Sequence, residues 1–263
     1  MSDDDYLFDT ASELGLHHMN FLENLFDPIT ADRLDAVGVR AGARCLDIGA
    51  GGGSVTRRLA GMAGPAGKVV SIDLDIDHLT AAPGVTVLRH DITEGVPPGG
   101  PFDLIHARLV LVHLPARERV LTMLVDALAP GGSLVLGELT DRPPRVLSAP
   151  SPADAELFKR IQYLSMEIVG PAAGQSFLWG TEVAHRMADA GLVDVQGVEY
   201  CRITRGGDDG CLLHRNLNVQ AEPALLAAGA TAEELERYRE LMLDPRFTAW
   251  FYQFVCLSAR KPI

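Results

Sequence analysis

Short apolar runs recur along the first half of the chain, and they limit the fold more than any other feature of the sequence. Helical or turn segments separate them, and residues 120–129 have the plainest helical spacing. Near-continuous apolar strands that alternate with helices predict a parallel sheet covered on both faces. The runs that we expect to form strands are 44–49, 68–73, 85–91, 102–107 and 132–139.

The first run leads into a glycine-rich turn with the sequence RCLDIGAGGGS. Gly49, Gly51 and Gly53 allow the backbone to approach a ligand where a Cβ would collide. A helix that starts after such a turn points its first N–H groups into it, which makes a site for a nucleotide-like ligand. A plain strand–helix turn is the alternative interpretation of the three glycines.

An acidic residue lies at or near the end of each of the first three runs. Asp47, just before the turn, would repel a pyrophosphate but suits a ligand with a cationic amino-acid end. Asp73 closes the second run, where a carboxylate can accept both hydroxyls of a ribose, or could instead cap a helix. Asp91 closes the third run, where it could accept from an adenine amino group while Ile92 covers the ring, or could simply start a turn.

Composition and charge exclude several classes of protein. The hydrophobic fraction of 47% is that of a packed globule, and the formal net charge of -12 repels polyanions. We therefore expect no nucleic acid and no anionic membrane as partner, because both need clustered Lys and Arg. No apolar run approaches the ~20 residues of a membrane span. The acidic start MSDDDYLFDT does not have the basic region of a signal peptide, so we expect a soluble, cytoplasmic protein.

Helices are also predicted before the first run and after the last. Residues 6–28 have helical spacing that should stop at Asp27-Pro28, and a short helix should follow over 30–37. After residue 140, DRPPRVLSAPSP predicts a linker, and Ser151-Pro152 has the pattern of a helix start.

The C-terminal third adds helices and two strands to this pattern. Thr181 to Ala190 predicts a helix, and GLVDVQGVEYCRI after it predicts a strand. Thr231 and Glu234 form the pattern of a capping box at the start of a further helix. The aromatic and β-branched run near 247–260 predicts the last strand.

Five motifs stand in the order found in class I S-adenosylmethionine-dependent methyltransferases: CLDIGAGGGS, VVSIDLD, VLRHDI, FDLIHARLVLVHLP and LAPGGSLVLGEL. As an ordered set they are specific, and they cover residues 40–140 strongly and most of the chain loosely. The chain resembles the small-molecule branch that includes quinone-biosynthesis and bacterial secondary-metabolite enzymes. The resemblance implies an α/β fold, with a Rossmann-like, doubly wound sheet of seven strands, an antiparallel last strand and a helical cap.

The resemblance also implies an organisation into segments. We expect an N-terminal helical cap segment over 1–40 and a core that binds S-adenosyl-L-methionine over 41–140. A helical cap insertion should follow over 141–178. Residues 179–263 should complete the core with its last helix and two strands, interrupted by a helical insertion over 210–245.

The family pattern assigns a role to each part of the cofactor site. Asp47, Gly49 and Gly51 would lie along the methionine part of S-adenosylmethionine, Asp73 with Leu74 at the ribose, and Asp91 with Ile92 at the adenine. Ala107 and Arg108, after the fourth strand, would lie near the amino-acid end; Arg108 could pair with the carboxylate of the cofactor or be a surface arginine. Tyr6 could close over the cofactor.

Methyl transfer needs few catalytic groups, because the donor carbon is already electrophilic and the protein mainly holds the acceptor and excludes water. A general base matters when the acceptor arrives protonated. His113 and Glu138 lie at the carboxyl edge of the predicted sheet and are the catalytic candidates, although each could serve a structural role instead. His106 lies within a strand and is expected in the core, and no metal-ligand spacing is present.

Aromatic and Met residues on the predicted cap helices could line an acceptor pocket, although such stripes are more often plain core. Together they indicate a small, apolar or aromatic substrate. A homodimer is compatible with the apolar insertions, but the sequence does not fix it. The candidate substrate-binding residues are His18, Phe21, Phe158, Tyr163, Met166 and Trp179.

Three other functions can be weighed against methyl transfer to a small molecule. An NAD-dependent oxidoreductase would have Gly or Ala where this chain has Ser54, and would not have Asp47. A methyltransferase-like protein could bind the cofactor without transferring methyl, as a cyclisation catalyst or a regulator. Nucleic-acid methylation would require an NPPY-like tetrapeptide where HARLV stands.

Overall fold

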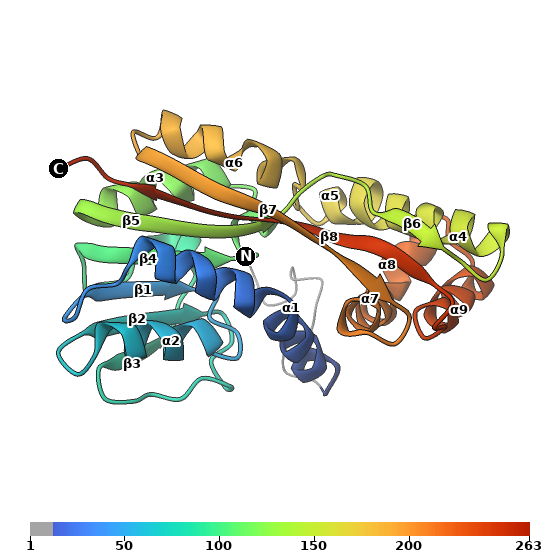
Figure 1. The fold of residues 1–263 in the computed structure, drawn as a ribbon, viewed down its shortest axis with the longest axis horizontal. Coiled ribbons are helices and arrows are strands. Elements are labelled where there is room, and N and C mark those ends of the chain that lie inside the picture. Colours follow the sequence, from blue (N-terminus) through green and yellow to red (C-terminus); the bar gives the residue numbers. More distant parts are fainter. Residues whose placement is uncertain (1–12) are drawn as a thin grey trace. The chain divides into compact units, whose positions relative to one another are not determined.

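Five adjacent parallel strands form one side of the sheet in the computed structural model, which describes residues 13–263 (Figure 1). Their hydrogen-bonded order is β3-β2-β1-β4-β5, and neighbours pair in parallel. The predicted runs are therefore confirmed as strands. Their bounds are β1 Arg44–Ile48, β2 Lys68–Asp73, β3 Val85–Arg89, β4 Phe102–Arg108 and β5 Leu128–Leu139.

The last strand, β8 Thr248–Arg260, is antiparallel, as predicted, and pairs with β5 from Ser133↔Arg260 to Leu139↔Phe254. β7 Val193–Arg205 also pairs with β8. The predicted count of seven strands is wrong, because the described residues form eight. The additional strand, β6 Arg145–Ser148, pairs with the start of β8 inside the segment that we predicted to be a linker. It is only four residues long and flanked by prolines, so it gives no alternating pattern to recognise.

The helices and short helical turns connect these strands. The predicted stop at Asp27-Pro28 is wrong, because one helix, α1, continues through Pro28. α1 tolerates Pro28 because Leu25, Phe26 and Ile29 around it are buried, and packing can outweigh the lost backbone hydrogen bond. The helices are α1 Glu13–Val37, α2 Ser54–Ala63, η2 Ile92–Glu94, η3 Leu111–His113, α3 Arg117–Ala127, α4 Pro152–Tyr163, η4 Leu164–Val169, α5 Gly170–Ala172, α6 Leu178–Asp189, α7 Asp209–Gln220, α8 Glu222–Ala227 and α9 Ala232–Leu241.

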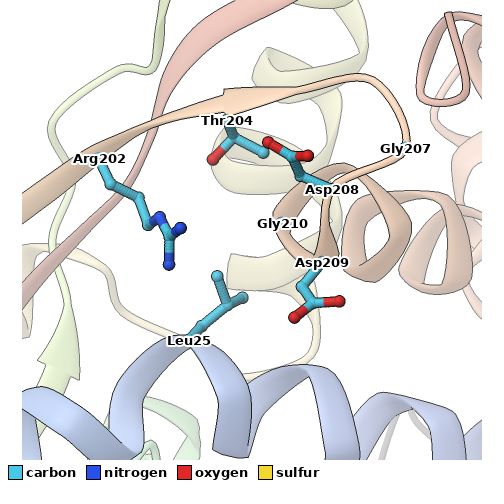
Figure 2. Close-up of a pocket in the computed structure, with 7 residues that line it drawn as sticks. All are labelled: Leu25, Arg202, Thr204, Gly207, Asp208, Asp209 and Gly210. Carbon is cyan, nitrogen blue, oxygen red and sulfur yellow. The ribbon is translucent and has the colours of Figure 1, made fainter. Parts of the chain in front are cut away.

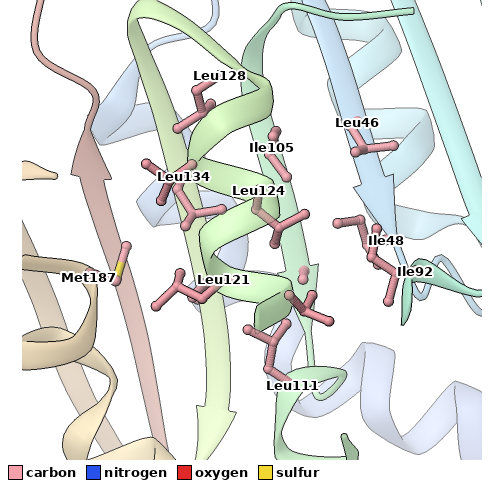
Figure 3. Packing of buried hydrophobic residues seen from close by; sticks show 14 of the residues in the cluster. Leu46, Ile48, Ile92, Ile105, Leu111, Leu121, Leu124, Leu128, Leu134 and Met187 are labelled. Atoms are coloured by element: carbon pink, nitrogen blue, oxygen red, sulfur yellow. The ribbon is translucent and has the colours of Figure 1, made fainter. Parts of the chain in front are cut away.

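Apolar residues on one face of the sheet pack against α3 and α6 (Figure 3). Side chains alternate between the two faces of a strand, so Leu46 and Ile48 of β1 lie on this face and Cys45 and Asp47 on the other. The second face carries several polar side chains at buried positions, including Asp47, Ser71 and His106. The sheet therefore has one apolar face and one face that carries several buried polar side chains.

The chain divides into two compact units by its internal contacts. Of the described residues, Phe26–Thr140, Phe177–Glu199 and Phe254–Ile263 make up one unit, which we call the sheet unit; residues 13–25, Asp141–Ser176 and Tyr200–Gln253 make up the other, which we call the helical unit. Each unit is assembled from three separate segments of sequence. α1, β7 and β8 each contribute residues to both.

The helical unit has its own aromatic core and well-defined helix starts. Ser151 caps α4 by accepting from the amide of Asp154, with Pro152 in the first turn, as predicted. The predicted capping box of α9 is also confirmed. The ring of Phe158 packs against Tyr238, Phe247 and Phe251 at centroid distances of 6.0, 4.9 and 5.0 Å.

Candidate functional site

The glycine-rich turn between β1 and α2 forms a cradle of backbone at the carboxyl edge of the sheet. Gly49, Gly51 and Gly53 have φ angles of 66°, 52° and 76°, which other residues rarely adopt. A Cβ on Gly49 would lie 2.3 Å from Cγ2 of Val110, so glycine is also required there by close packing. α2 begins after Gly53 with no side chain capping its first N–H groups, which leaves them oriented for a ligand.

Asp73 lies at the tip of the neighbouring strand and binds the glycine turn directly. Its Oδ2 accepts from the amide of Gly51 at 2.8 Å, and its Oδ1 accepts from the amide of Asp75 at 3.2 Å. Burial raises the pKa of Asp73, and these backbone hydrogen bonds partly offset that effect. Leu74 follows it, half-buried, and its carbonyl accepts from Nη1 of Arg89 at 2.5 Å.

Asp91 and Ile92 follow the third strand, where Asp91 caps η2. Oδ1 of Asp91 accepts from both the amide and the hydroxyl of Thr93, at 2.8 and 2.7 Å. The side chain of Ile92 is buried within the apolar cluster of the sheet unit. Asp91 thus starts a turn, and Ile92 has little surface left for an aromatic ring.

Asp47 has a different environment from the one that we predicted from the sequence. Only 1% of the residue is exposed. Its Oδ1 lies 2.8 Å from Nδ1 of His106, and its Oδ2 accepts from the hydroxyl of Thr56 at 2.5 Å. The Thr56 hydroxyl also lies 2.9 Å from that of Ser71. Both carboxylate oxygens of Asp47 are therefore bound inside the protein, where they link β1, β4 and α2.

The end of β4 carries Ala107, which is fully buried, and Arg108, which binds α1. Nη1 of Arg108 donates to Oδ1 of Asp27 at 2.7 Å and to the hydroxyl of Thr30 at 3.2 Å. The same Asp27 oxygen accepts from the Ser54 hydroxyl at 3.0 Å. In this structure Asp27 is thus the partner of Arg108, and it also reaches the first residue of α2.

Glu138 lies on β5 with no exposed surface, and its carboxylate binds the turn after β4. Oε1 accepts from the amide of Leu111 at 3.1 Å and Oε2 from that of Val112 at 3.3 Å. Burial raises the pKa of Glu138 to about 8, although these bonds favour the charged form. The indole N–H of Trp179 has no hydrogen-bond partner within hydrogen-bond geometry among the described residues, but it lies near enough to Glu138 to favour the ionised carboxylate as well.

These contacts give Glu138 a positioning role on the 111–113 turn instead of a direct one on a substrate. His113 ends that turn, half-buried, and its amide donates to the carbonyl of Val110 at 3.0 Å. Leu109, just before the turn, has a φ of 55°, which is strained for a residue with a branched side chain. Sequence reasoning did not identify Leu109, Val110 or Thr56, since apolar residues and a lone Thr give no signal of such contacts.

The predicted substrate-binding residues lie in several environments. Trp179 belongs to the buried cluster of the sheet unit, and Phe158 to the core of the helical unit, so neither is available to line an open pocket. Tyr163 is 58% exposed and Met166 half-buried. Phe21 is half-buried beside His17, and burial lowers the pKa of His18 to about 4. Tyr6 lies outside the described residues.

Two further features are absent from the same part of the chain. Within residues 13–263, no group of three or more His, Cys, Asp and Glu side chains could hold a metal ion. Over this range, too, no helix combines the length and apolarity that crossing a membrane requires.

Known proteins resemble this chain in both sequence and fold. Residues 21–196 match the model of a family described as a methyltransferase domain. Trans-aconitate 2-methyltransferase of Variovorax paradoxus (strain S110) is 32% identical over 180 residues, which cover 62% of this chain and 68% of that protein.

Among solved structures, phosphoethanolamine N-methyltransferase 2 of Haemonchus contortus, in complex with S-adenosyl-L-methionine, matches with a TM-score of 0.55 and 17% identity. That match covers 96% of this chain and 58% of the other. The cyclase SpnF matches with a TM-score of 0.51 and 18% identity, over 90% of this chain and 81% of the other. At such identities the likeness concerns the fold alone.

Proposed function

This chain belongs to the methyltransferase-domain family and is an S-adenosylmethionine-dependent methyltransferase of small molecules, and we propose that its acceptor is a small metabolite with an apolar or aromatic body. The observation that carries the cofactor assignment is the hydrogen bond from the Gly51 amide to Asp73, which joins the glycine turn to a carboxylate at one edge of the sheet. The relative named trans-aconitate 2-methyltransferase supports a small-molecule acceptor. A role in bacterial secondary metabolism is part of the proposal.

The residues of the sheet unit fit S-adenosylmethionine. We assign Gly49 and Gly51, with the uncapped start of α2, to its methionine part, and Asp73 to its ribose hydroxyls. Asp91, which is half-buried at the same edge of the sheet, would border the adenine. Asp47 would act indirectly in this arrangement, by fixing Thr56 of α2 and so the start of the helix beside the turn.

When bound, this cofactor supplies an electrophilic methyl carbon on a positively charged sulfur. The protein must then orient the acceptor and exclude water, which can account for much of the lowering of the barrier. Glu138 and Arg108 would contribute by holding the 111–113 turn and α1 in place at the edge of the sheet. His113, at the end of that turn, is the candidate for removing a proton from the acceptor.

Substitution of Asp73 tests the cofactor assignment. We expect Asp73→Asn to weaken binding of S-adenosylhomocysteine by about 1–3 kcal/mol, through lost charge-assisted hydrogen bonds. Calorimetry should also compare S-adenosylhomocysteine with its 2′-deoxyribose analogue. The wild type should prefer the hydroxylated ligand, and Asp73→Asn should lose that preference.

Asp77→Asn provides the control, because Asp77 is an exposed acid close to Asp73 in sequence. It should keep both the affinity and the preference for ribose. An Asp73→Asn variant that still discriminates between the two ribose forms would contradict the assignment, even if its overall affinity were lower.

The role of His113 has its own test. If its imidazole accepts the proton of the acceptor, His113→Ala should lower kcat by about 10²-fold or more while changing KM little. Steady-state assays of S-adenosylhomocysteine release would measure both constants. His185→Ala, on the exposed face of α6, is the matched control and should leave them unchanged. A kcat within a few-fold of wild type would return His113 to a structural role.

A further inference from the structure

The helical unit contains a polar pocket that the cofactor site does not use. Its volume is about 340 Å³, and Leu25 of α1 supplies its one apolar side chain (Figure 2). The end of β7 supplies Arg202 and Thr204, and residues 207–210 at the start of α7 supply the rest. A cavity of this size lies at the small end of the range for small-molecule sites.

β7 presents a cation and a hydroxyl to this pocket. Arg202 and Thr204 are two residues apart and so lie on the same face of the strand. The guanidinium of Arg202 is exposed, and no carboxylate of the described chain forms an ion pair with it. Thr204 is 2% exposed, and its hydroxyl has no hydrogen-bond partner among the described residues. A buried polar atom without a partner is unfavourable, and a ligand that accepts a hydrogen bond from this hydroxyl would remove that penalty.

The start of α7 presents the opposite charge. Asp208 precedes the helix but makes no capping bond with its side chain, because its Oδ2 accepts from the amide of Arg205 at 3.0 Å instead. In Figure 2 the carboxylate of Asp209 lies across the pocket from the guanidinium of Arg202. The pocket therefore has a cationic side on β7 and an anionic side on α7.

This separation of charge decides which ligand would bind. A purely anionic ligand would be repelled by Asp208 and Asp209, and a purely cationic one by Arg202. We propose that the pocket binds a small zwitterion, with a carboxylate toward Arg202 and Thr204 and a protonated amine toward Asp209. The inference goes beyond the proposed function, since the pocket lies within the helical unit and shares no residue with the cofactor site.

Calorimetry with simple probes tests the proposal on the full chain saturated with S-adenosylhomocysteine. The probes are 4-aminobutanoate and 6-aminohexanoate, each compared with the carboxylic acid and the amine of the same carbon chain. At least one zwitterion should bind about tenfold or more tightly than both of its singly charged analogues. Equal binding of the three, or no binding of either zwitterion, would overturn the proposal.

Two variants assign the charges to their side chains. Arg202→Gln should reduce the affinity for the zwitterion to that for the amine, and Asp209→Asn should reduce it to that for the acid. Arg215→Gln removes an exposed cation of α7 that does not line the pocket, and it should bind like the wild type. Equal loss in Arg215→Gln would contradict a local site and indicate attraction by the overall field.

Titration of the same proteins with S-adenosylhomocysteine alone separates this inference from the proposed function. If the wild type fails to bind S-adenosylhomocysteine, the cofactor assignment fails. If it binds normally but shows no preference for a zwitterion, only the pocket assignment fails.

Discussion

At the scale of single residues, the buried carboxyl group of Glu138 affects how the stability of the protein responds to pH. Its side chain has no contact with solvent, and it joins β5 to the amides of the 111–113 turn. Burial raises its pKa to about 8, above the ordinary value of 4.5. The native protein therefore keeps a proton on Glu138 at pH values where the unfolded chain has lost it.

The sign of the effect on stability follows from this difference in bound protons. Between pH 4.5 and about 8 the folded state binds more protons than the unfolded state, so the free energy of unfolding falls as pH rises. We expect the wild type to lose stability relative to Glu138→Gln across this window, by up to about 1.4 kcal/mol per pH unit. Urea unfolding at pH 5.5, 6.5, 7.5 and 8.5 would measure it, and parallel pH curves for the two proteins would contradict it.

At the scale of elements, the apolar runs predicted the strands well, because burial on both faces leaves a continuous signal in the sequence. The same burial explains why the direction of Asp47 and Glu138 could not be predicted. In a strand covered on both sides, every position is buried, so the pattern does not distinguish an acid that faces a ligand from one that binds a neighbouring strand. In α1 the sequence signal is strong but misleading, since Pro28 predicts the end of a helix and tertiary packing overrides that signal.

Pro28 should therefore destabilise α1, and its removal is a direct test. Pro28 is exposed, has no N–H for the carbonyl four residues earlier and lies inside the helix. Pro28→Ala should raise the free energy of unfolding by about 1–3 kcal/mol. Asn24→Ala, at another exposed position of α1, controls for helix propensity alone and should change stability by less than about 1 kcal/mol. Denaturant unfolding would compare the two variants. An unchanged free energy of unfolding for Pro28→Ala would show that Pro28 does not destabilise α1.

At the scale of the whole molecule, neither compact unit corresponds to one continuous stretch of sequence. The sheet unit needs residues from the beginning, the middle and the end of the chain, and so does the helical unit. A prediction of successive segments follows the order of the motifs along the chain. Such a prediction could not reveal that α1, β7 and β8 each supply residues to both units. Neither the spacing of apolar residues nor the composition changes at the points where these elements pass from one unit to the other.

The position of β8 has a consequence for how the protein is made. β5 obtains its antiparallel neighbour from the final part of β8, where Arg260 pairs with Ser133. A chain emerging from the ribosome therefore has an unpaired sheet edge on β5 until Thr248–Arg260 has been translated. Nascent chains that stall or are cut before β8 is complete would expose that edge to pairing with other chains.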